Sequence, residues 1–239
     1  MRLAAVVTLT TVPVWAYVGL RIDSRVGATG QLALGVLTAL VFVGLLRLHT
    51  PAVRFQAVGV VVIATIGEVV GSLLWGLYSY RLDNIPTFVP PGHGLVYLAG
   101  FSIAALGGRS ALPLLASVVA AAWGIAGLTV LPTDVAGAIG CAFLVVVLLG
   151  TRVPVYAGVF LVVAALELYG TAVGTWTWSS TVPGLGLPQG NPPSGVASGY
   201  VVFDVLALAL AVRLRALRLP VPRRRDAIQM RPRAEASSS

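Results

Sequence analysis

Long apolar runs alternate with short polar segments along most of the chain. The apolar runs are about 18–25 residues long, enough for an α-helix to cross a hydrocarbon layer of ~30 Å. They predict helices at about 3–20, 30–48, 53–79, 91–108, 111–130, 133–150, 154–178 and 194–216. The pattern therefore predicts an all-α, polytopic membrane protein with about eight transmembrane helices.

The composition agrees with a chain solvated by lipid. Of the 239 residues, 57% are hydrophobic and 10% are charged, and the mean hydropathy is +0.92. A soluble domain does not need this much apolar surface. The first apolar run has no convincing small-x-small cleavage site, so we predict a retained helix rather than a signal peptide. The single cysteine, Cys141, excludes an intramolecular disulfide framework, and no cofactor is expected.

The arginines predict an orientation. Eight spans place both termini on one side, together with Arg2, Arg47, Arg54, Arg109 and Arg152 and with the Arg-rich segment that ends the chain. The positive-inside rule then predicts cytoplasmic termini in a multi-pass protein of the cell membrane. We expect 217–239 to be a disordered basic tail that contacts anionic lipid headgroups, and we do not expect a nucleic-acid partner.

Two stretches about a hundred residues apart share an order of residues. Each has a glutamate in an apolar run, a glycine three residues later, an aromatic-x-aromatic pair, and a loop with Pro-x-x-x-Pro-Pro. The elements are Glu68, Gly71, Tyr78, Tyr80 and Pro86, Pro90, Pro91, then Glu167, Gly170, Trp176, Trp178 and Pro188, Pro192, Pro193. We interpret this as a duplication with halves 1–108 and 109–216, related by an axis along the membrane normal.

The proline pairs suit the first turn of a helix, where backbone N–H groups have no helical partner. A stiff loop entering a helix is one interpretation. The alternative is a pair of rigid rims, facing outward, over one shared site.

Three acids fall within predicted spans: Glu68, Glu167 and Asp204. A carboxyl at that depth nearly always faces the bundle interior or a cavity. Equivalent positions in two halves would bring the two glutamates toward a common centre, where they would handle protons. The alternative is that both are protonated and only hydrogen-bond neighbouring helices.

His93 begins a predicted helix, with Tyr97 one turn later, and Tyr200 and Asp204 have the same spacing near the C-terminus. His93 is a candidate proton donor or acceptor, or alternatively a helix cap. A metal site is not expected, because the chain has two histidines and His49 is predicted on the other side.

Aromatic residues cluster toward the outer ends of the two glutamate helices. Helical spacing predicts Trp75 and Tyr78 on the face of Glu68, and Trp176 and Trp178 lie near Glu167. They form either an interfacial belt or, with Tyr97 and Tyr200, the wall of a substrate pocket that would stabilise a cation.

The segments "GEVVGSLLWGLYSY" and "LELYGTAVGTWTW" resemble the membrane hydratases of carotenoid biosynthesis, of the bisanhydrobacterioruberin hydratase type. They are also similar to small polytopic terpene cyclases. The resemblance implies that Glu68 and Glu167 are candidate acids.

Three functional hypotheses follow. The first is a membrane enzyme that hydrates, cyclises or isomerises a lipid or isoprenoid by carboxylic-acid chemistry. The second is a small proton-coupled transporter or flippase, and the third is a non-catalytic assembly subunit. The expected partners are membrane lipids and the lipid substrate, with a homo-oligomer as an open alternative.

Overall fold

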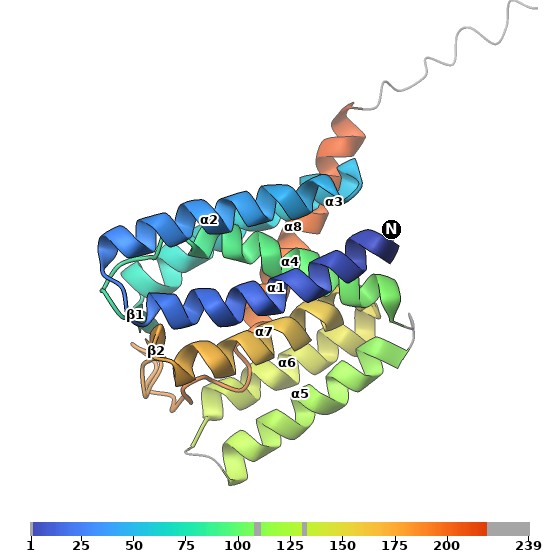
Figure 1. The fold of residues 1–239 in the computed structure, drawn as a ribbon. Helices are drawn as coiled ribbons and strands as arrows, with labels where there is room; N and C mark the ends of the chain where they lie inside the picture. Colours follow the sequence, from blue (N-terminus) through green and yellow to red (C-terminus); the bar gives the residue numbers. More distant parts are fainter. Residues whose placement is uncertain (1, 108–110, 131–132, 219–239) are drawn as a thin grey trace, which may run out of the picture.

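The structure, a computed structural model, describes residues 2–107, 111–130 and 133–218 (Figure 1). Arg109 and the predicted tail beyond residue 218 lie outside these residues. The described chain forms eight α-helices, one π-helix and two short β-strands. They are α1 (Arg2–Asp23), α2 (Ala28–Arg47), α3 (Pro51–Glu68), η1 (Val69–Leu74), β1 (Tyr78–Tyr80), α4 (Val89–Leu106), α5 (Ala111–Thr129), α6 (Val135–Thr151), α7 (Pro154–Ala172), β2 (Trp176–Trp178) and α8 (Ala197–Arg218).

Within the described residues, six helices are long and apolar enough to cross a membrane: α1, α2, α3 with η1, α4, α5 and α7. Two shorter apolar helices, α6 and the first part of α8, accompany them. Large apolar side chains such as Leu40 (63% exposed) and Val146 (70% exposed) cover the outer surface. A water-soluble protein rarely exposes so many, whereas lipid tails solvate them. The prediction of a helical chain with several apolar helices long enough to cross a membrane is confirmed.

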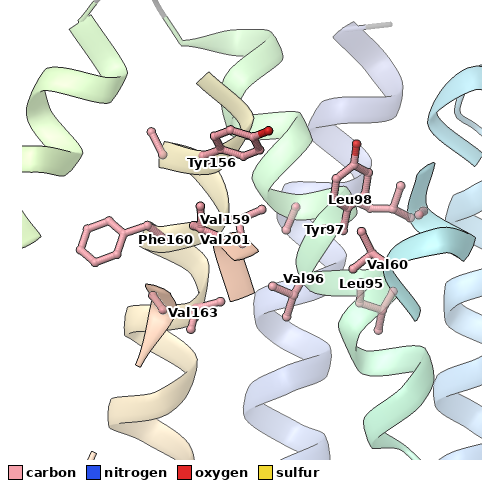
Figure 2. Packing of buried hydrophobic residues seen from close by; sticks show 14 of the residues in the cluster. Val60, Leu95, Val96, Tyr97, Leu98, Tyr156, Val159, Phe160, Val163 and Val201 are labelled. Carbon is pink, nitrogen blue, oxygen red and sulfur yellow. The ribbon is translucent and has the colours of Figure 1, made fainter. Parts of the chain in front are cut away.

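Helix α4 lies inside the bundle and packs against α1, α2, α3 and α7 (Figure 1). Its closest approach is to α7, where a Cβ added to Gly158 would overlap the carbonyl oxygen of Gly100. Figure 2 shows Tyr97 and Leu98 of α4 and Val159 and Phe160 of α7, which belong to one buried hydrophobic cluster. Small residues let two helix backbones approach where hydrophobic exclusion from water is absent. This contact fixes the two helices that carry His93 and Glu167.

The predicted helices at 53–79 and 154–178 are too long, and this is a correction. The α-helical geometry ends at Glu68 and at Ala172, and both aromatic pairs lie on β-strands instead of helix ends. Gly76 (φ 73°) and Gly174 (φ 75°) turn the chain two residues before each strand. A left-handed backbone is readily adopted by glycine and ends a helix. The prediction that Trp75 and Tyr78 share a helix face with Glu68 was therefore wrong.

The two strands pair antiparallel, with Tyr78 opposite Trp178, Ser79 opposite Thr177 and Tyr80 opposite Trp176 (Figure 1). Side chains two apart on a strand point to the same face. Both aromatic residues of each pair therefore point the same way, and the exposed Ser79 and Thr177 point the other way.

The proline pairs differ in their relation to the next helix. Pro90 and Pro91 lie in the first turn of α4, as the sequence predicts. Helix α8 begins at Ala197, three residues later than predicted, because Ser194 is still held in the loop by a hydrogen bond to Asp134.

Candidate functional site

The described residues enclose a cavity of about 530 Å³ between α1, α4, α7, α8 and the two strands. Glu68, Glu167 and His93 all line it. Ten aromatic side chains also line it: Trp15, Tyr17, Tyr78, Tyr80, Phe88, Tyr169, Trp176, Trp178, Tyr200 and Phe203. The two glutamates therefore share one largely apolar, aromatic chamber, as the duplicated pattern predicts.

Glu68 is the last residue of α3 and is 4% exposed. Its Oε2 accepts hydrogen bonds from the hydroxyls of Tyr78 (2.6 Å) and Tyr80 (2.8 Å). Its Oε1 lies 3.1 Å from Nε2 of His93. This nitrogen is buried and makes no directed hydrogen bond in the described chain, so the contact is close but poorly aligned. The Glu68–His93 pair is thus assembled inside the bundle.

Glu167 lies on α7, five residues before its end, and is 3% exposed. Its Oε2 accepts hydrogen bonds from the indole nitrogens of Trp176 (2.8 Å) and Trp178 (3.1 Å). The Tyr200 hydroxyl lies near the same carboxyl. Glu167 lines the cavity, so a molecule in the cavity would meet this carboxyl.

The segments that follow Glu68 and Glu167, which carry these donors, fold in a similar way. In each case an acid near a helix end is followed by a glycine three residues later, a left-handed glycine and a strand whose two aromatics reach back to the acid. The distance along the chain from Glu68 to Tyr78 is one residue longer than from Glu167 to Trp176. The π-helix η1 lies in that longer segment. A π-turn absorbs one extra residue in a helix, and such turns are frequent at functional sites.

The small residue beside each acid makes room for an aromatic ring. A Cβ on Gly71 would contact the Tyr78 ring at 3.3 Å, and a Cβ on Gly170 would overlap the Trp176 ring. In the sequence these glycines appear only as part of the repeated pattern. In the structure they allow the strand aromatics to lie against the helix and reach the carboxyl.

His93 and Tyr200 bring α4 and α8 to the same chamber, with ring centroids 5.5 Å apart. Both were sequence candidates.

Three candidates do not line the cavity. Trp75 is 47% exposed and donates to the Pro183 carbonyl. Tyr97 donates to Gln56 Oε1 at 2.9 Å, and Asp204 is 1% exposed with Oδ2 unpaired among the described residues.

Residues that the sequence did not single out complete the chamber. Trp15 and Tyr17 come from α1, Tyr169 from α7 and Phe203 from α8. No motif marks them, because each is an ordinary aromatic in an apolar run. The second member of the Tyr-x-Tyr pair, Tyr80, is the deeper one, with an exposed fraction of 5%.

Two aspartates hold the proline loops in place. Asp134 accepts hydrogen bonds from the backbone N–H groups of Gly137, Gly190 and Ser194. Asp23 accepts one from Gln31, whose side chain in turn accepts one from Asn84. Asp134, with three backbone donors, is held firmly. It anchors the loop that contains Gly190 and Ser194 to the start of α6, and Asn84 in the earlier proline loop is linked through Gln31 to Asp23 at the end of α1.

The chamber offers few metal donors. Glu68 and His93 supply two adjacent ligand groups, and no cluster of three His, Cys, Asp or Glu side chains suited to a metal occurs in the part of the chain that the structure describes. The groups present are instead a pair of acids, an imidazole, phenols and indoles, which is a set suited to proton transfer beside an aromatic wall.

Comparison with protein-family models, with curated proteins and with solved structures finds no match to this chain. Function is therefore inferred from the chamber and its surroundings.

Proposed function

We propose that this chain is a membrane-embedded enzyme that protonates a lipid or isoprenoid and thereby hydrates, cyclises or isomerises it. The observation that carries the proposal is one aromatic-lined cavity, inside a bundle of apolar helices, that contains both glutamates and His93. Buried acids in a pocket with few other polar groups are a recurrent feature of catalytic sites.

The proposed topology has eight spans with both termini in the cytoplasm of a cell-membrane protein. Helices α6 and α8 would be the remaining two spans beside the six long ones. Arg47 and Arg54 lie together at the α2–α3 connection, where the Arg54 guanidinium donates to the carbonyls of Arg47 and His49. Basic groups at this end favour the cytoplasmic side, which leaves the strands and proline loops outside.

The proposed duplication, with halves 1–108 and 109–216, is supported by the strand register. Tyr78 and Trp176 occupy matching places in the two halves, as do Tyr80 and Trp178. In the ladder Tyr78 pairs with Trp178 and Tyr80 pairs with Trp176. A two-fold axis along the membrane normal requires this exchange, because each residue must pair with the equivalent of its partner. Helix packing agrees in part, since α3 packs on α8 and α7 on α4.

The two acids differ in a way that suggests separate roles. Glu68 has two phenol donors and an imidazole beside it, which favour its ionised form. Glu167 is bonded by neutral indoles, and burial without an adjacent cation favours the neutral carboxylic acid. We assign Glu167 as the general acid, and Glu68 with His93 as the base.

In the proposed step the O–H bond of Glu167 breaks and its proton goes to one carbon of a C=C bond. The π electron pair forms the new C–H bond, and the other carbon becomes a cation. The faces of Trp176, Tyr200 and their neighbours stabilise this cation. Glu68 then accepts a proton from a neighbouring carbon, giving an isomer or a ring, or from a water molecule that has added, giving an alcohol. Return of the proton to Glu167 restores the enzyme.

A proton-coupled transporter of parallel repeats is the second candidate. It is favoured by one observation, which is that acids at matching places in the proposed halves face the same cavity. Such a protein would move its substrate unchanged. The non-catalytic assembly subunit differs from both, because it would tolerate loss of either carboxyl.

The test is comparative extraction of apolar and polar lipids from cells that carry the gene, lack it, or carry Glu167→Gln. The matched control is Asp204→Asn, a second buried carboxyl that does not line the cavity. We expect a product in wild-type and Asp204→Asn cells, and its loss in Glu167→Gln cells with equal amounts of protein in the membrane. Identical extracts from all four strains would reject the enzyme. A pH-dependent flux in proteoliposomes would then assign the transporter.

A further inference from the structure

The cavity is elongated parallel to the helices. Along α4 it extends from Val89 to Ile103, which is about 20 Å at the ~1.5 Å rise per residue of an α-helix. It also follows α1 from Leu20 to Leu9. This length is more than half of a ~30 Å hydrocarbon layer. A compact ligand would leave much of it empty, whereas an extended chain fits its shape.

The acids lie at one end of this long cavity. Glu68 is at the end of α3, next to β1, and Glu167 is near the end of α7, next to β2. From there the lining becomes aliphatic and continues through Val12, Leu161 and Ile103 toward the other end of the bundle. A chain in the cavity would therefore have its reacting part beside the carboxyls and its remainder among apolar side chains.

The lining contains no Lys or Arg within the described residues, and its ionisable acids are two carboxyls. Arg81, the basic residue closest in sequence to β1, donates to the backbone carbonyls of Asp23 and Val26. An anionic headgroup in this chamber would be desolvated beside two carboxyls with no cation except an imidazole, which is strongly unfavourable. The occupant's reacting end is therefore uncharged.

The cavity reaches the outer surface of the bundle between α1 and α7. Three exposed residues belong to its lining: Pro13 and Tyr17 on α1, and Ala165 on α7. Tyr17 and Tyr169 stack there with ring centroids 5.2 Å apart, and the Tyr169 hydroxyl donates to the Tyr17 carbonyl at 3.2 Å. In a bilayer this surface faces lipid tails, so the opening leads sideways into the membrane.

We infer that the cavity takes a single, uncharged, unsaturated hydrocarbon chain, which enters from the bilayer between α1 and α7 past the Tyr17–Tyr169 pair. Its reacting double bond lies at Glu167, and the rest of the chain lies along α1 and α4. This inference rests on the proposed function for the choice of a double bond. The position and charge of the chain rest on the cavity alone.

The experiment uses purified protein in lipid nanodiscs and a diazirine-bearing isoprenoid alcohol as the probe. A diazirine-bearing phosphatidylcholine, whose zwitterionic headgroup carries a phosphate anion and a quaternary ammonium, serves as the comparison with a charged headgroup. Ala165→Cys places a thiol at the opening, and Leu168→Cys is the control on the same helix, 53% exposed and not part of the lining. Cys141, the native cysteine, is buried and lies outside the lining, so it gives little background. Each variant is labelled with a bulky maleimide.

We expect light to cross-link the isoprenoid probe to peptides that line the cavity, and phosphatidylcholine to outer faces. The bulky label at position 165 should lower the cavity cross-link by roughly tenfold or more, while the label at 168 leaves it unchanged. If both labels lower the cavity cross-link equally, or if neither lowers it, the inferred lateral entrance is wrong. If phosphatidylcholine cross-links to the cavity as strongly as the isoprenoid probe, the inference that the occupant is uncharged is wrong.

The cross-linking result can be distinguished from the result of the lipid extraction that tests the proposed function. Glu167→Gln should bind and cross-link the probe as wild type does, because the change keeps the size of the side chain. If Glu167→Gln still yields product in cells, the assigned acid is wrong while the cross-linking result stands. If the probe never reaches the cavity, the inferred occupant is wrong regardless of the lipid extracts.

Discussion

Replacement of Gly170 by alanine should disturb the site through one indole ring. The new methyl group would overlap the ring of Trp176, which is 7% exposed and is held by a hydrogen bond to Glu167, so the ring must shift and strain that bond. The matched change is Gly71→Ala, where the corresponding contact with Tyr78 is 3.3 Å and a shift of a few tenths of an ångström suffices.

The magnitudes follow from three contributions. Overpacking of a buried site costs about 1–3 kcal/mol. Loss of the hydrogen bond to Glu167 leaves the indole N–H of Trp176 unpaired, and an unpaired buried donor costs about 1–3 kcal/mol. Replacing a helical glycine by alanine returns about 1 kcal/mol. Gly170→Ala should therefore destabilise the protein by about 3 kcal/mol, which for a chain of this size lowers the melting midpoint by roughly 6–12 °C. Gly71→Ala should stay within about 1 kcal/mol of wild type.

The assay is thermal unfolding of the two purified variants in the same detergent, followed by tryptophan fluorescence. Lipid extracts from cells carrying each variant show whether the acid still works. Gly170→Ala should lose both stability and product, and Gly71→Ala should keep both. Equal midpoints for the two variants would refute the claim that Trp176 is wedged between Gly170 and Glu167.

Three further predictions use the same unfolding assay. Gly158→Ala should separate α4 from α7 at Gly100 and cost about 1–3 kcal/mol, whereas Gly150→Ala, with nothing near its new methyl, should be neutral or slightly stabilising; equal effects would contradict the close contact. Tyr80→Phe removes a buried hydrogen bond to Glu68 and should cost about 1.5–3 kcal/mol; an unchanged midpoint would contradict that bond. Burial, with a contribution from Arg54, lowers the pKa of His49 from its ordinary value of 6.5. The neutral imidazole therefore contributes fully to the stability of the fold above that value. This contribution declines as the pH falls through the lowered pKa of the folded state. The melting midpoint should fall as the pH is lowered from about 8 to about 5, and it should fall less steeply in His49→Gln.

Much of the bundle could be predicted from the sequence. Long apolar runs specify helices because the backbone must satisfy its own hydrogen bonds in lipid. Glu68, Glu167 and His93, which the sequence singles out, line one cavity. A carboxyl within an apolar helix nearly always faces the bundle interior or a cavity. Proline pairs marked the loops that precede α4 and α8.

The strands could not be predicted, because their cause is tertiary. Residues 78–80 and 176–178 are nearly a hundred residues apart, and neither segment alone is long enough for a strand signal. Gly76 and Gly174 looked like ordinary glycines in apolar helices until their left-handed conformations showed where the helices end. The sequence also could not predict that Asp204 lies away from the cavity, for a related reason. Spacing along α8 relates it to Tyr200 but does not tell which neighbour its face meets.

The central claim is that Glu167 gives its proton to a carbon atom of a neutral chain lipid inside the shared cavity. The most direct measurement is mass spectrometry of lipids from membranes incubated in D₂O with wild-type protein, Glu167→Gln or Asp204→Asn. The account predicts deuterium at one carbon of the product with wild type and Asp204→Asn, and none with Glu167→Gln. Equal deuterium in all three samples, or in none, would contradict it.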